Sequence, residues 1–156
     1  MDQQQINELN STINLPNGQP RPTLFEWDAM YSVKVDRLDG HHKRLFDLIN
    51  KLHVAMLARE AKSVLAATLD ELIAYTKMHF SAEENLLKSS GYPDLSAHMM
   101  EHDRFVRTVE EFQKHFESGQ QFLSVQLMDF LKDWLCNHIL RTDQKYSDFL
   151  AAKGAR

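Results

Sequence analysis

Four long segments of the chain carry apolar residues at steps of three and four, the spacing that gathers them on one face of an α-helix. Pro93 is the last proline, and little else would interrupt a helix after Pro22. Short links between the segments make consecutive helices antiparallel neighbours. The sequence therefore predicts an all-α protein, an up-down-up-down antiparallel four-helix bundle. Its helices are expected from about Asp39 to Arg59, Ala61 to Lys88, Leu95 to Glu117 and Gln121 to Ala151.

The start of the chain differs from these segments in composition. Residues 1–24 are polar, rich in Pro, Asn and Gln, and have no periodic apolar face, so we expect a non-helical N-terminal arm or extension. Residues 25–38 are apolar enough to lie against the bundle without forming a long helix. We expect one domain over residues 25–156, since the length is sufficient to bury a substantial core.

Charge and composition argue against several classes of partner. The net charge of −4 gives no electrostatic reason to expect nucleic-acid binding. No apolar stretch approaches the roughly 20 residues that span a bilayer, and the polar N-terminus does not resemble a signal peptide. Cys136 is the only cysteine, which excludes an internal disulfide. These features suit a cytoplasmic protein that does not contact a membrane.

The histidines are the unusual feature, because five of the eight stand at metal-ligand spacings on the apolar faces of the expected helices. Two pairs are four residues apart, and that spacing places both side chains on one helical face. Asp143 lies five residues after His138 and could reach the core only near a helix end or a local distortion. The inward-facing candidates are His42, His79, Glu83, His98, His102 and His138.

A metal site explains this burial better than ordinary packing does. Burying each of these polar groups without a partner would cost several kcal/mol. The total would be on the order of the stability of a whole domain. Coordination to a metal ion supplies the missing partners. The other notable side chains have simpler interpretations. We expect His53 and His115 to be exposed or partly packed at the surface, Cys136 to pack, and Met99 and Met100 to fill the core.

Several short motifs include or adjoin the candidate ligands. They are Asp39 to Lys43, His79 to Glu84, Gly91 to Pro93, His98 to His102 and Trp134 to Asp143. In their order and spacing they resemble the motifs of bacterial hemerythrins, and the match extends from about Phe25 to Leu150. Lys34 stands where that family usually has Gly, a departure expected to matter only locally.

The resemblance implies a cofactor of two iron ions joined by an oxo or hydroxo bridge. One iron would be held by His98, His102 and His138, and the other by His42 and His79, with Glu83 and Asp143 bridging both. His41 occupies a position where the family often has Gln, so the ligand role is assigned to His42. With octahedral irons, this set leaves one coordination position open, on the iron with two histidines.

The open position implies reversible dioxygen binding for storage, delivery or sensing, rather than enzymatic catalysis. Phe80, Trp134 and Leu135 match apolar positions around the family's oxygen pocket, and Leu45 and Ile49 could join them. We interpret Tyr146 mainly as a packing residue, with a supporting role at the site as the alternative. Two other functions use the same site. One is a di-iron oxidoreductase acting as an oxidase, a peroxidase or a nitric-oxide reductase, and the other is an iron- or oxygen-responsive regulator with an unidentified protein partner.

Overall fold

The computed structural model describes residues 25–119 and 125–154, and within them every regular element is helical. The arm predicted for residues 1–24 lies outside the described residues. The prediction that residues 25–38 lack a long helix is confirmed, except that the first long helix begins at Asp36 rather than near Asp39. The elements are η1 (Ala29–Tyr31), α2 (Asp36–Leu57), α3 (Lys62–Ser89), α4 (Leu95–Glu117), α5 (Val125–Asn137), η2 (His138–Asp143) and α6 (Gln144–Ala152).

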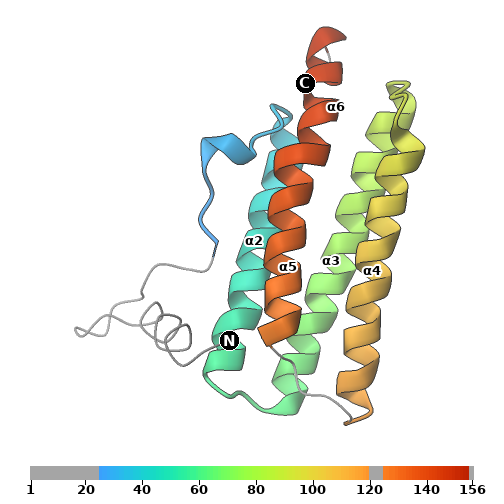
Figure 1. The fold of residues 1–156 in the computed structure, drawn as a ribbon. Helices are drawn as coiled ribbons and strands as arrows, with labels where there is room; N and C mark the ends of the chain where they lie inside the picture. The colour runs from blue at the N-terminus through green and yellow to red at the C-terminus, as the bar shows by residue number, and fades with distance from the viewer. Residues whose placement is uncertain (1–24, 120–124, 155–156) are drawn as a thin grey trace, which may run out of the picture.

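The long helices form the predicted antiparallel bundle (Figure 1). α2 packs against α3 and α3 against α4, while α5 contacts both α2 and α4 and so closes the bundle. α6 continues the line of α5, and residues 25–35 run outside the bundle toward the start of α2 (Figure 1). No helix in the described part of the chain has the length and apolar character needed to cross a membrane.

The ends of the helices follow from local chemistry. Asp36 and Asp39 lie in the first turn of α2, where carboxylates interact favourably with the helix dipole. α3 ends at Ser89, and Gly91 adopts a left-handed conformation with φ of 71° that lets the chain reverse direction. The break expected between the second and third helices is therefore confirmed.

The last long helix contains a distortion that the apolar periodicity did not predict. Its middle portion, η2, is a π-helix that joins α5 to α6. A π-helix bonds residues five apart, so His138 and Asp143 come to the same side of the helix. The local distortion that Asp143 needs in order to reach the core is present, and both side chains are buried.

The core consists of two apolar clusters. The larger cluster includes Leu52, Leu69, Phe105 and Leu131 and fills the bundle from α2 to α5. The smaller cluster joins Val33, Val35, Leu38, Leu87, Tyr92, Tyr146 and Leu150. Along α2, α4 and the α5–α6 line, four buried histidines fall between members of the two clusters: His42, His98, His102 and His138. A polar layer therefore interrupts an otherwise apolar interior.

The segment before α2 is attached by specific hydrogen bonds. The backbone N–H of Phe25 donates to Asn50 Oδ1 at 2.8 Å, and Asn50 Nδ2 donates to the Phe25 carbonyl at 2.9 Å. Lys34 has φ of 59°, a left-handed conformation that costs a non-glycine residue about 1–2 kcal/mol. A glycine would adopt this conformation without that cost. In the same turn, Asp39 accepts hydrogen bonds from the Ser32 hydroxyl and the Val33 backbone N–H.

Candidate metal centre

The structure brings all seven predicted ligand side chains together inside the bundle. None of them is more than 4% exposed, although all are polar or charged. They come from α2, α3, α4 and η2, so each of the four walls of the bundle contributes. The seven are His42, His79, Glu83, His98, His102, His138 and Asp143. We call them the polar layer.

The first group of converging atoms belongs to Glu83, His98, His102 and His138, whose ligand atoms all lie within 4.8 Å of one another. The Nε2 atoms of His102 and His138 are 3.1 Å apart. Glu83 Oε1 lies 2.6 Å from His98 Nε2 and 3.1 Å from His102 Nε2. Three imidazole nitrogens and one carboxylate oxygen thus point at a common centre.

The second group consists of His42, His79 and, again, Glu83. The Nε2 atoms of His42 and His79 are 3.1 Å apart. Glu83 Oε2 lies 3.6 Å from His42 Nε2 and 3.4 Å from His79 Nε2. Glu83 therefore turns one oxygen toward each group.

Asp143 divides its oxygens in the same way. Its Oδ1 atom lies 3.0 Å from His138 Nε2 and 3.3 Å from His98 Nε2, both in the first group. Its Oδ2 atom lies 3.3 Å from His42 Nε2, in the second group. Two carboxylates that each face both groups are arranged as bridges between two neighbouring cations.

The residues present fit a metal centre. Both oxygens of Asp143 are fully buried without a hydrogen-bond partner, a costly condition for a carboxylate inside a protein. The Nε2 atoms of His42 and His79, and those of His102 and His138, also converge at 3.1 Å, so one nitrogen of each pair must carry a proton unless a cation accepts both lone pairs. A cation in each group would accept these lone pairs, and imidazole with carboxylate is a donor set that suits iron or zinc.

The electrostatics of the layer also favour positive charge. Burial opposes charge on His42, but the neighbouring carboxylates of Asp143 and Glu83 outweigh it and raise its pKa to about 9. Burial likewise opposes charge on His138, but Asp143 raises its pKa to about 10. Burial and the charge of Glu83 would raise the pKa of Asp143, yet His138 and His42 lower it to about 2. Without a metal ion, the carboxylates hold protons on these histidines.

His41 and His42 differ in burial and in whether the ring faces the centre of the second group. His42 is 1% exposed and its Nε2 atom faces the second group. His41 is only half-buried, and its Nδ1 atom contacts the outer nitrogen of His79, at 3.0 Å, rather than the centre. The structure thus places His42 among the converging ligands and His41 behind one of them.

Aromatic rings cover the first group. Phe80 stacks on His102 with ring centroids 3.7 Å apart and planes 3° apart, and Trp134 stacks on His138 at 4.3 Å and 12°. Phe80 and Trp134 also contact each other. Leu45, Ile49 and Leu135 are buried in the larger apolar cluster. Their role as an oxygen pocket remains a prediction, but apolar side chains of this kind limit the access of water to a metal centre.

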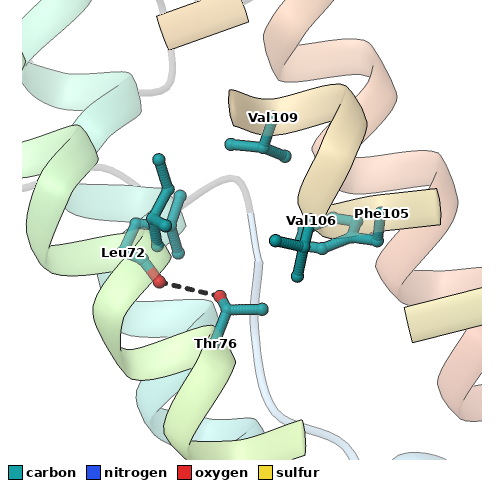
Figure 2. Close-up of a pocket in the computed structure, with 6 residues that line it drawn as sticks. Leu72, Thr76, Phe105, Val106 and Val109 are labelled. Carbon is teal, nitrogen blue, oxygen red and sulfur yellow. Dashed lines mark hydrogen bonds between the residues drawn. The ribbon is translucent and has the colours of Figure 1, made fainter. Parts of the chain in front are cut away.

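A small apolar cavity of about 10 Å³ lies between α3 and α4 (Figure 2). Thr76, the one polar residue of its lining, donates its hydroxyl to the Leu72 carbonyl at 2.7 Å, so the walls offer no free polar group. A cavity this small and apolar does not stabilise a water molecule. One wall is Phe105, whose ring also contacts Phe80 and Trp134, the two rings that stack on histidines of the first group.

Three residues that support the layer were missed or underrated by the sequence analysis. Tyr146 is fully buried and donates its hydroxyl to Glu83 Oε2 at 2.8 Å, so interpreting it mainly as a packing residue was wrong. The Nδ1 atom of His102 donates to Glu84 at 2.7 Å, and that of His138 donates to Glu101 at 2.8 Å. Their signal in the sequence is position, since each glutamate directly adjoins a predicted ligand.

Three other expectations for individual residues were wrong. His53 is not a surface residue; it is 6% exposed, because its position on α2 turns toward α5. Met99 and Met100 are not core fillers; they are 43% and 60% exposed, because turning His98 and His102 inward points the residues between them outward. Cys136 packs as expected, half-buried with its Sγ atom 3.8 Å from the Tyr31 hydroxyl.

Comparison with known proteins identifies the family. The model of the hemerythrin HHE cation binding domain matches residues 33–150. The chain belongs to the hemerythrin family. The match includes all seven side chains of the polar layer, and the resemblance inferred from the order of the motifs is confirmed.

Individual hemerythrins are similar over most of their length. The bacteriohemerythrin of Methylococcus capsulatus is 38% identical over 130 residues, which cover 83% of this chain and 98% of that protein. A hemerythrin-like protein of Naegleria gruberi is 34% identical over 129 residues, covering 83% and 96%. A crystal structure of wild-type hemerythrin superposes with a TM-score of 0.76 at 37% identity, covering 80% of this chain and 96% of that one. The predicted four-helix bundle is therefore confirmed.

Proposed function

We propose that this hemerythrin binds dioxygen reversibly at a centre of two iron ions joined by an oxo or hydroxo bridge. The arrangement of Glu83 and Asp143, each with one oxygen toward either group of histidines, is the observation that carries the proposal. His98, His102 and His138 would hold one ion, and His42 and His79 the other. Membership in the hemerythrin family supports both the metal and the ligand.

The two groups differ in the number of imidazoles they provide, which defines where a small ligand would bind. The group of His42 and His79 has one imidazole fewer than the group of His98, His102 and His138. An octahedral ion in the smaller group would therefore keep an open coordination position. Two ferrous ions would together supply the two electrons that dioxygen accepts on binding.

The protein's own contribution is to hold the ligands and keep the site dry. Tyr146 fixes the orientation of Glu83 by its hydrogen bond to Oε2. Phe80 and Trp134 stack on two of the histidines, and Leu45, Ile49 and Leu135 would complete an apolar pocket. Such surroundings limit the loss of a reduced oxygen species to water, which favours reversible binding over turnover.

Optical titration of the anaerobically reduced, iron-loaded protein with dioxygen tests this function. We expect a ligand-to-metal charge-transfer band that appears on oxygenation and disappears on deoxygenation over repeated cycles. Rapid irreversible conversion to the diferric state, without a stable coloured adduct, would contradict reversible binding. Consumption of dioxygen or nitric oxide with a reducing co-substrate would favour a di-iron oxidoreductase instead.

A further inference from the structure

The two groups differ in the number of their histidines and in the partners of the outer ring nitrogen, Nδ1, which points away from the centre of each group. In the three-histidine group, two of the rings use their outer nitrogen to donate to a carboxylate. His102 Nδ1 donates to Glu84 Oε2 at 2.7 Å, and His138 Nδ1 donates to Glu101 Oε2 at 2.8 Å. The third ring, His98, has a buried Nδ1 atom without a hydrogen-bond partner.

The two-histidine group has no carboxylate at either outer nitrogen. His79 Nδ1 faces the Nδ1 atom of His41 at 3.0 Å, so its partner is another imidazole. His42 Nδ1 is buried without a hydrogen-bond partner. The outer contacts thus place two negative charges behind one group and none directly behind the other.

The two carboxylates also connect neighbouring helices. Glu84 lies on α3 and holds a histidine of α4, while Glu101 lies on α4 and holds a histidine of η2. Each contact joins one wall of the bundle to the next, on the side of the three-histidine group. Their side chains are 22% and 46% exposed, so both carboxylates stand between the buried rings and solvent.

We propose that Glu84 and Glu101 are positioning residues that fix the ring orientation and tautomer of His102 and His138, so that the ion in the three-histidine group is held more firmly than its neighbour. The inference rests on the two-metal centre proposed above. A carboxylate that accepts the outer N–H keeps Nε2 unprotonated and makes it a stronger donor to the metal. Losing such a partner typically weakens metal binding by about 10-fold to 100-fold.

Zinc is a suitable probe, because it binds imidazole and carboxylate and does not change oxidation state. The zinc-loaded protein is mixed with an excess of a coloured chelator, and the release of each ion is followed in time. In Glu84→Gln and Glu101→Gln the amide oxygen can still accept the N–H, but the negative charge is lost. We expect the more slowly released ion to leave about tenfold faster in each variant, and the rate for the other ion to stay unchanged.

A matched control and a second readout separate positioning from simple destabilisation. Glu71→Gln removes an exposed carboxylate of α3 that pairs with Lys51 and Arg44, and it should change neither rate. In the zinc-loaded protein, the Nδ1 proton signals of His102 and His138 should move in the proton NMR spectrum of the corresponding variant only. The metal-free chain of all three variants should remain folded, as measured by circular dichroism.

Each outcome bears on the proposal. Equal acceleration of both ions, no acceleration, or unmoved Nδ1 proton signals would overturn the positioning role while leaving the two-metal centre intact. If the unaltered protein does not bind two zinc ions, the proposed centre fails and this inference fails with it. In the His42→Ala background, where only the three-histidine group remains complete, each glutamine variant should still lower zinc affinity about tenfold. Unchanged affinity there would also overturn the proposal.

Discussion

The larger apolar cluster and the polar layer occupy the same bundle and are equally buried, yet they are stabilised in opposite ways. Leu52, Leu69 and Leu131 in the cluster are fully buried and need only close packing. Glu83 and Asp143 in the layer are also fully buried, and both lower the stability of the chain unless a positive charge compensates them. The apolar cluster therefore stabilises the bundle by packing alone, whereas the polar layer needs bound protons or metal ions to compensate its buried carboxylates.

Removing the shared carboxylate should have the largest effect. Glu83 belongs to both groups of ligand atoms, so Glu83→Ala should lose most of both metal ions rather than one. Metal content per chain, measured by elemental analysis after loading with iron, checks this expectation. Retention of one full ion would show that Glu83 serves a single group and is not a bridge.

Replacing a ligand histidine, but not its neighbour, with alanine should have the next largest effect. His42→Ala removes an Nε2 atom from the second group and should lower iron content from about two ions to about one per chain. His41→Ala removes a contact behind His79 and should leave iron content nearly unchanged. The reverse pattern would mean that the ligand is His41 and that the register of α2 is misassigned.

In the metal-free chain, the polar layer should make stability depend on pH. The folded-state pKa values of His42 and His138, about 9 and about 10, lie above the ordinary value of 6.5, so their protonation stabilises the fold below pH 6.5. That contribution is lost as pH rises through 9 and 10. His79 does not oppose it, because burial lowers its pKa and it is already neutral above pH 7.

Chemical denaturation of the metal-free chain at several pH values measures this dependence. The free energy of unfolding should fall between about pH 7 and pH 10, whereas the Leu131→Ala variant should show the same slope from a lower starting value. A stability that stays constant over this interval would contradict the protonation of the layer.

A truncation in the larger cluster should affect stability alone. Leu131→Ala leaves a cavity among fully buried side chains and should lower the free energy of unfolding by about 2–5 kcal/mol. Because Leu131 contributes no ligand atom, iron content and the optical spectrum should be nearly unchanged. A loss of metal comparable to that of His42→Ala would show that the two regions are not separable.

The sequence predicted the features that depend on regular helical geometry. The apolar stripes predicted the bundle, and the i,i+4 pairs His79/Glu83 and His98/His102 predicted which rings and carboxylate face inward. Both predictions hold because these side chains lie on undistorted stretches of α3 and α4. The sequence also placed His42 on the inner face of α2, where the structure has it.

The features that could not be predicted depend on distortion or on neighbours from other helices. The five-residue step from His138 to Asp143 indicated that a distortion was needed, but a π-helix has no clear signature in apolar periodicity. Tyr146 and Glu101 act through partners on other helices, and their contacts follow only from the packing of the bundle. The burial of His53 likewise depends on how α5 lies against α2.

The central claim is that the polar layer is a centre for two metal ions, and anomalous diffraction from crystals of the iron-loaded protein tests it most directly. Data collected at the iron absorption edge should give two peaks inside the bundle. One peak should lie beside His98, His102 and His138 and the other beside His42 and His79, with Glu83 and Asp143 contacting both. A single peak, or a second peak coordinated by His41, would contradict the account.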